Sequence, residues 1–319
     1  MRTSIRWRAL GAALLVFALV AAACGDDDGS GEGADGTATV ASQLVFGGPP
    51  ECPARQSCLI GLEEAGIEFS EFKPLDAGGP VTRTALEGGE IDVALLFSTD
   101  AAIAVNGWVV LDDDIGLNPV ENITPVVRQD VVDSLGDPFV GLIDEVSARI
   151  DTPGLTELNR QQSVDGDDPA QIAGRWLDEN GFNAFTQEVK PDVPVIVSSF
   201  NFGESEILAE IYAQVMERAG YTVERKLNLG NREIVKPALE SGEIGFVPEY
   251  AGTILTFLGG TPTGDPESTH ADLVEAYGEL GIAVLGYAPA EDKNAIVVTS
   301  EIAAQYGLSA ISDLAAAAG

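Results

Sequence analysis

Residues 66–91, GIEFSEFKPLDAGGPVTRTALEGGEI, and residues 220–244, GYTVERKLNLGNREIVKPALESGEI, follow the same plan. Each begins at a glycine, alternates like a strand, passes a glycine-containing loop and a short helix, and ends on Ala-Leu-Glu-x-Gly-Glu-Ile. An apolar run and a polar turn follow each copy, at 92–100 and 245–253. Strands that alternate with helices favour a mostly parallel sheet. The duplication therefore predicts two lobes on one βαβ plan, with fewer copies than a solenoid needs.

The clearest helix lies just before the second copy, over 205–219. Its apolar residues recur at helical spacing and form one stripe: Ile207, Leu208, Ile211, Tyr212, Val215 and Met216. We interpret the stripe as core rather than as a cofactor site, and Gly220 suits the position after a helix end. Ligands of such sheets gather beyond the carboxyl ends of the strands. The site is therefore expected on the polar turns at 47–58, 98–100, 198–205 and 250–253.

The N-terminal segment 1–23 predicts export. Arg2, Arg6 and Arg8 precede a short apolar run that ends at residue 20, too short to span a membrane comfortably. Ala-Ala-Ala-Cys24, followed by Gly-Asp-Asp-Asp, is typical of a bacterial lipobox in which the cysteine is acylated, although lipoboxes more often carry leucine where Ala21 stands. A plain signal peptide cut nearby is the alternative. Residues 24–42 are predicted to be the lipidated cysteine and a flexible tether, because Gly/Asp-rich sequence cannot build a core.

Charge and cysteine content narrow the partners. The chain has 51 acidic and 17 basic residues, so it repels nucleic acid, whose affinity depends on Lys and Arg. If Cys24 carries lipid, Cys52 and Cys58 remain, and export places them in an oxidising compartment, which predicts a disulfide. Two free thiols or a metal pair are the alternatives. A metal is disfavoured because His270 is the only histidine.

No pattern predicts an enzyme, a cofactor or a metal. His270 ends the stretch PTGDPESTH (262–270), whose composition predicts a loop, so a Ser–His–Asp arrangement is not credible. The chain has neither a Walker loop nor a dinucleotide fingerprint. The acidic runs 112–114 and 165–168 lack calcium-loop spacing and are interpreted as solvated turns.

Candidate ligand contacts lie mainly on the polar turns. Aromatic faces suit a quaternary ammonium, which has no N–H to donate, and arginine suits a carboxylate. Each aromatic residue has the alternative role of filling the core. The candidates are Arg55, Phe97, Ser98, Thr99, Asp100, Asn201, Phe202, Glu204, Asn231, Arg232, Tyr250, Thr253, Tyr287 and Asn294.

Several long segments resemble one family. They include LVFGGPPECPARQSCLIGLEEAGIEF (44–69), NFGESEILAEIYAQVMERAGY (201–221), LGNREIVKPALESGEIGFVPEYAGT (229–253) and DKNAIVVTSEIAAQYGLSAISDL (292–314). These segments resemble the solute-binding proteins of glycine betaine, carnitine and choline ABC transporters, and the resemblance extends over 43–319. In that family, the stretch found here at 194–319 comes first and the stretch at 43–182 follows.

The reversed order resembles a circular permutation, with the usual ends joined through 183–193; a misassembled gene model is the alternative. The resemblance implies an α/β, two-lobed, periplasmic-binding-protein-like fold of type II, each lobe a mixed sheet flanked by helices. Two crossover strands, in 121–128 and 296–299, would join the lobes. One lobe would then be split, 43–122 plus 296–319, and the other continuous, 123–295.

The resemblance also implies a ligand site with an aromatic cage. Tyr250 matches the cage, whereas Phe97 stands where tyrosine is common, and Asn294 stands where choline and carnitine binders often have tyrosine. Tyr287 is expected to compensate, and Arg55 lies in a loop that often supplies an arginine to the ligand carboxylate.

The function implied is that of a non-enzymatic lipoprotein, anchored through its lipid to the outer face of the cell membrane and expected to be monomeric. It would capture a small quaternary-ammonium solute by hinge closure and deliver it to an ABC permease. A sensory or scaffold lipoprotein of the same fold, with another small polar ligand such as an amino acid, is the alternative. A hydrolase is disfavoured by the lack of a usable histidine.

Overall fold

The computed structural model describes residues 38–183, 185 and 192–318. The predicted signal peptide, the lipidation site at Cys24 and most of the tether lie outside the described residues, as does part of the 183–193 junction. Within these ranges, no helix has both the length and the apolar composition needed to cross a bilayer.

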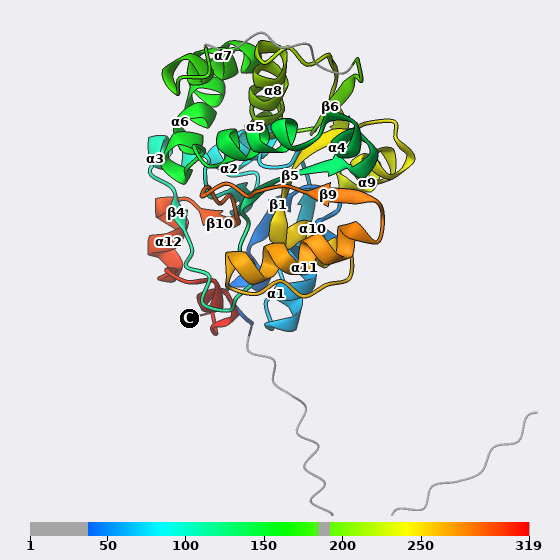
Figure 1. Cartoon of the computed structure of the whole chain (residues 1–319). Coiled ribbons are helices and arrows are strands. Elements are labelled where there is room, and N and C mark those ends of the chain that lie inside the picture. The colour runs from blue at the N-terminus through cyan, green and yellow to red at the C-terminus, as the bar shows by residue number, and fades with distance from the viewer. Residues whose placement is uncertain (1–37, 184, 186–191, 319) are drawn as a thin grey trace, which may run out of the picture. The chain divides into compact units, whose positions relative to one another are not determined.

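Two five-stranded sheets form the framework of the described chain (Figure 1). The first has the order β2-β1-β3-β10-β4 and the second the order β7-β6-β8-β5-β9. The strands of the first sheet are β1 Val45–Gly48, β2 Glu71–Pro74, β3 Val93–Phe97, β4 Val109–Val110 and β10 Asn294–Val298. Those of the second are β5 Ile123–Arg128, β6 Val195–Phe200, β7 Val223–Gly230, β8 Phe246–Tyr250 and β9 Ile282–Val284. The two orders correspond position by position, which confirms the two-lobed α/β fold predicted from the duplicated segments.

Each sheet combines a parallel part with one strand that arrives from the other lobe. Strand β1 pairs in parallel with β2 and β3, and β6 pairs in parallel with β7 and β8. The fourth strand of each sheet, β10 or β5, is antiparallel to its neighbours. The chain therefore crosses between the lobes twice, before β5 and before β10. The domain bounds drawn from the sequence stay a prediction.

The two crossovers lie side by side. Asn122 and Glu291 form an isolated antiparallel bridge, and the backbone N–H of Asp292 donates to the carbonyl oxygen of Glu121 at 3.1 Å. Residues from both crossovers consequently meet at one place between the lobes.

Helices flank both sheets, and Figure 1 shows α6, α7 and α8 grouped at one end of the second lobe. The helices of the first lobe are α1 Gly61–Glu64, α2 Pro80–Glu87, α3 Ala101–Asn106 and α12 Ser300–Tyr306, with short 3-10 or π turns η1 Ala41–Gln43, η2 Cys52–Ala54, η3 Gln56–Ile60 and η4 Ile311–Ala315. The helices of the second lobe are α4 Gln129–Leu135, α5 Asp137–Ser147, α6 Thr152–Ser163, α7 Pro169–Glu179, α8 Gly203–Arg218, α9 Arg232–Ser241, α10 Ala251–Phe257 and α11 Pro266–Gly278.

Helix α8 is the central helix of the second lobe. Every residue of the apolar stripe predicted over 205–219 is fully buried, which confirms its assignment to the core. Burial of one large apolar side chain contributes roughly 1.5–3 kcal/mol. The one polar atom of the stripe, the Tyr212 hydroxyl, lies 2.9 Å from the Ser147 hydroxyl, so its hydrogen bonding is satisfied inside the core.

The loop predicted around His270 is wrong, because this histidine lies in helix α11. Asp265 is the N-cap, and its carboxylate accepts a hydrogen bond from the Ser268 N–H at 2.9 Å. Pro266 occupies the first helical turn, where its missing N–H and fixed φ are favourable. The Asp-Pro pair that looked loop-like is therefore the start signal of a helix.

Candidate ligand-binding site

A cavity of about 110 Å³ lies between the lobes, and we call it the aromatic cavity. Its lining comes from both sheets and from both crossovers. From the first lobe these residues include Arg55, Phe97 and Asn294, from the second Phe200, Asn201, Phe202, Asn231, Arg232, Tyr250 and Thr253, and from the crossovers Glu121 and Asp292.

The aromatic side chains of the cavity cluster around Phe202. Its ring centroid lies 5.2 Å from that of Phe97, and 5.9 Å from those of Phe200 and Tyr250. Phe97 ends strand β3 of the first lobe, whereas Phe202 precedes helix α8 of the second. The Phe97–Phe202 contact therefore joins the two lobes and places four aromatic rings at one cavity.

A buried ion pair forms part of the second lobe's wall. The Arg232 Nη2 lies 2.7 Å from Glu249 Oε2, and Nε donates to the same carboxylate at 3.2 Å. Only 11% of the Arg232 side chain and 1% of the Glu249 side chain are exposed. The guanidinium also lies over the Phe200 ring, 5.1 Å from its centroid. The charge of Arg232 is thus already balanced by Glu249.

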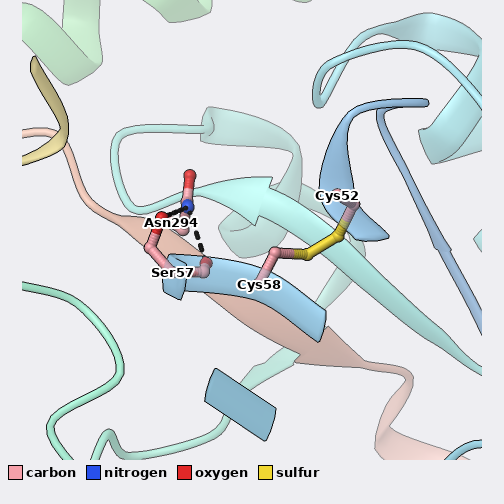
Figure 2. The surroundings of a disulfide bond; sticks show 4 residues. All are labelled: Cys52, Ser57, Cys58 and Asn294. Carbon is pink, nitrogen blue, oxygen red and sulfur yellow. Dashed lines mark hydrogen bonds between the residues drawn. A yellow bond between two sulfur atoms is a disulfide. The ribbon is translucent and has the colours of Figure 1, made fainter. Parts of the chain in front are cut away.

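The loop closed by the Cys52–Cys58 disulfide forms the opposite wall (Figure 2). The Asn294 amide donates to the Ser57 carbonyl at 3.0 Å, which ties this loop to strand β10. Arg55, also in the loop, reaches across to the second lobe and pairs with Glu233 at 2.6 Å. The two lobes are therefore linked here by an ion pair.

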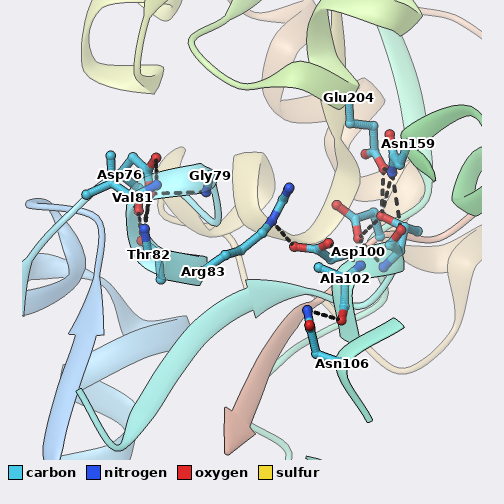
Figure 3. Close-up of polar contacts among 12 residues, drawn as sticks. Asp76, Gly79, Val81, Thr82, Arg83, Asp100, Ala102, Asn106, Asn159 and Glu204 are labelled. Carbon is cyan, nitrogen blue, oxygen red and sulfur yellow. Dashed lines mark hydrogen bonds and ion pairs between the residues drawn. The ribbon is translucent and has the colours of Figure 1, made fainter. Parts of the chain in front are cut away.

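A buried polar network bridges the lobes beside the cavity. The Thr99 hydroxyl oxygen lies 2.7 Å from Glu204 Oε2 and 2.8 Å from Asp292 Oδ1, and it accepts from Asn159 Nδ2 at 3.0 Å. The Tyr250 hydroxyl donates to Glu204 Oε1 at 2.8 Å, and Figure 3 shows Asn159 beside Glu204. A hydroxyl has one proton to donate, so Thr99 can donate to only one of the two carboxyls at a time. Burial raises the pKa of both carboxyls, and the charge of Glu204 raises that of Asp292 further.

Glu121 is a second buried acid, on the first crossover. The Thr253 hydroxyl donates to Glu121 Oε1, and burial raises the pKa of this carboxyl to about 7 against the effect of that hydrogen bond. The neighbouring glycine makes the contact possible. A Cβ at Gly252 would lie 2.4 Å from the Val120 carbonyl oxygen, so only glycine lets α10 approach the crossover this closely.

A second cavity of about 390 Å³ adjoins the first and shares Ala77, Phe97, Asn201 and Phe202 with it. Arg83 and Asp100, which pair at 2.8 Å, line it together with Asn159 and Glu204 (Figure 3). Among the residues that the structure describes, no group of His, Cys, Asp and Glu is arranged to hold a metal ion.

The structure brings most of the predicted contacts together. The aromatic cavity has Arg55, Phe97, Asn201, Phe202, Asn231, Arg232, Tyr250, Thr253 and Asn294, and the second cavity adds Thr99, Asp100 and Glu204. Two predicted residues lie elsewhere. Ser98 lines neither cavity and donates a hydrogen bond to Asp292, and Tyr287 packs against His270 with ring centroids 5.1 Å apart. Tyr287 therefore does not supply the missing face of the cage.

Among the residues of the aromatic cavity that were not predicted from the sequence are Phe200, Glu121 and Asp292. Phe200 ends the apolar strand β6, and Glu121 and Asp292 lie on the two crossovers. For the acids, the available signal was their position beside the two predicted crossover strands.

The raised carboxyl pKa values predict that mild acid stabilises the protein. Glu121, Glu204, Asp292 and Asp100 all have pKa values raised by burial. The native state then binds more protons than the unfolded state above about pH 4.5, so stability decreases as pH rises through the native pKa values. For Glu121 alone, the change from 4.5 to about 7 corresponds to roughly 3 kcal/mol.

We expect a higher melting temperature at pH 5.5 than at pH 8, measured by circular dichroism. The Glu121→Gln variant is expected to have a smaller difference between the two pH values. A melting temperature that stays constant or rises from pH 5.5 to 8 would contradict the assignment of these acids.

Two equivalent lobes, two adjacent crossovers and an aromatic, acidic cavity between them define a two-lobed small-solute-binding protein. Within that class, the chain belongs to the family described as the substrate-binding domain of ABC-type glycine betaine transport systems, whose model matches residues 37–179 and 193–319. Members of this class bind their solute outside the cytoplasm and are not enzymes.

Individual relatives match over shorter stretches. The chain is 26% identical to the glycine betaine-binding protein YehZ of Escherichia coli K12 over 134 residues, which cover 40% of this chain and 44% of the relative. It is 28% identical to a glycine-betaine-binding protein of Pseudomonas aeruginosa over 142 residues, covering 44% and 45%. The chain thus spans under half the length of these curated relatives. Among solved structures, an ancestral arginine-binding protein bound to arginine matches with a TM-score of 0.42 at 15% identity, over 86% of this chain and 90% of that one.

Proposed function

We propose that this chain is the solute-binding lipoprotein of an ABC importer, and that it captures a small quaternary-ammonium solute of the glycine betaine, choline and carnitine class. The observation that carries the proposal is the group of four aromatic rings beside buried carboxyls in the aromatic cavity. A desolvated ammonium over an aromatic face gains up to about 2 kcal/mol. The carboxylate of Glu121, when ionised, adds attraction for the same positive charge.

Capture would proceed by hinge closure. The lobes touch through the ring contact of Phe97 with Phe202, the hydrogen bond of Thr99 with Glu204 and the ion pair of Arg55 with Glu233. All three contacts join side chains, so they would separate without unfolding either sheet. The adjacent crossovers would act as the hinge, and closure would remove the solute from water before delivery to the permease.

A lipid on Cys24 would hold the protein at the outer face of the cell membrane. The support is the sequence pattern up to this cysteine. The Cys24→Ser variant is expected to be recovered in the soluble fraction after export, whereas the parent protein sediments with membranes. Equal sedimentation of both proteins would argue against lipidation.

We also propose that the chain order is a circular permutation. The segments at 38–40 and 316–318 pair through backbone hydrogen bonds of 2.9 Å and 2.8 Å, from Val40 N to Ala316 O and from Ala318 N to Ala38 O. In the family's order these two segments would be consecutive in the chain, so their proximity supports the proposal. Sequencing the transcript tests the proposal. A transcript in the family's usual order would show that the gene model is misassembled.

The ligand proposal is tested by calorimetry with glycine betaine, choline and carnitine. The matched control is 3,3-dimethyl-1-butanol, in which carbon replaces the ammonium nitrogen of choline. We expect at least one ammonium compound to bind and the neutral analogue to bind at least tenfold more weakly. Heat with an amino acid alone would favour the alternative ligand, and no heat with any ammonium compound would overturn the proposal.

A further inference from the structure

Three buried oxygen atoms at the aromatic cavity lack a hydrogen-bond donor. They are Glu121 Oε2, Asp292 Oδ2 and Asn231 Oδ1, and none has a partner within the described residues. Glu121 is only 3% exposed and Asp292 only 4% exposed. Buried acceptors are nearly always paired in folded proteins, so three at one cavity indicate a ligand that donates hydrogen bonds.

The positive groups of the same cavity already have partners. Arg232 is paired with the buried Glu249, and Arg55 is paired with Glu233 and lies over the Phe257 ring, 5.0 Å from its centroid. The charges of both arginines are therefore balanced before any ligand binds. Within the described residues, no lysine or arginine forms an ion pair with Glu121 or Asp292, although the charge of Arg232 lowers the pKa of Glu121 against the larger effect of burial.

A ligand carboxylate would consequently meet acidic groups. It would face Glu121 across a small cavity, and at pH 8, above the Glu121 pKa of about 7, the two like charges would repel strongly in a water-poor site. It would also leave the three acceptors without donors. A hydroxyl or N–H group at the same place would donate to these acceptors without adding negative charge.

We propose that the aromatic cavity takes an organic cation that carries a hydroxyl or N–H donor and no carboxylate, as choline does and glycine betaine does not. This inference rests on the proposed function and divides its ligand class in two. The aromatic rings would hold the ammonium group, and Glu121, Asp292 and Asn231 would accept hydrogen bonds from the other end of the ligand. A site built to pair with a donor discriminates more strongly than an apolar pocket does.

The test compares the binding of three quaternary ammonium compounds to the intact protein at pH 8. Choline presents a hydroxyl, glycine betaine a carboxylate, and tetramethylammonium neither. By isothermal titration calorimetry we expect choline to bind best, at least tenfold more tightly than glycine betaine, with tetramethylammonium between them. Glycine betaine binding as tightly as choline, or more tightly, would overturn this inference and leave the proposed function standing. No binding of any of the three would overturn the proposed function itself.

A charge-neutralising variant tests the role of the acceptor. Glu121→Gln removes the negative charge while preserving the shape, and it is expected to lower the choline-to-betaine affinity ratio at least fivefold. The matched control is Glu63→Gln, at an exposed position of helix α1, which makes the same change in net charge. Because the readout is a ratio, a general loss of stability would not produce it. An unchanged ratio in Glu121→Gln would contradict the assignment of this acceptor.

Discussion

Replacement of Arg232 by methionine (Arg232→Met) is expected to lower the free energy of unfolding by about 3–5 kcal/mol. The variant would leave Glu249 buried without its counter-ion, and only 1% of that side chain is exposed. An unpaired, buried carboxylate either keeps its charge, at the full cost in desolvation free energy, or takes up a proton. The buried acid Glu121 lies in the same region and adds to the unfavourable field. Urea unfolding followed by circular dichroism measures the change.

Two further variants separate this effect from general damage. Adding Glu249→Leu to Arg232→Met removes the unpaired acid and is expected to recover much of the lost stability. Arg160→Met breaks the exposed ion pair with Glu157, whose side chains are 37% and 52% exposed, and is expected to change stability by less than about 1 kcal/mol. If Arg232→Met stayed within that range, the buried pair would not have the structural role described.

This prediction revises what Arg232 is expected to do. The sequence suggested a free arginine for a ligand carboxylate, since arginine is the usual partner for that group. The structure pairs it with Glu249, which lies in strand β8, within the apolar run that follows the second copy of the repeat. The two residues are seventeen positions apart and lie on different elements, so no local sequence pattern indicates the pairing.

The framework was predictable because short-range sequence patterns indicate it. The paired Ala-Leu-Glu-x-Gly-Glu-Ile segments occupy equivalent places in both lobes, ending α2 and α9 before strands β3 and β8. The stripe on α8 needed only helical periodicity. In contrast, Glu121 and Asp292 are buried because two crossovers far apart in sequence lie side by side. In a chain with 51 acidic residues, nothing local distinguishes these two from solvated acids.

The aromatic cage also depended on long-range packing. Phe200 belongs to the strand β6, where an apolar residue is expected on the core side, yet its ring stacks on Phe202 at the cavity. Tyr287 was expected to compensate for the thinner cage, but it packs on His270 of helix α11.

Phe202 is the ring that links the cage to lobe closure, so Phe202→Ala is expected to weaken binding of the best ammonium ligand by about 30-fold or more. The loss of one desolvated cation–π contact of up to about 2 kcal/mol accounts for that factor, and the lost contact with Phe97 across the lobes adds to it. Calorimetry measures the affinity, and circular dichroism measures the melting temperature. The matched control is Phe69→Ala, which removes a ring stacked on Phe46 at 4.8 Å within the first lobe. The control is expected to lower the melting temperature but change affinity less than threefold, because its ring serves packing alone. Equal affinities of Phe202→Ala and the parent protein would mean that the solute is bound without this cage. That result would contradict the proposed site but not the fold.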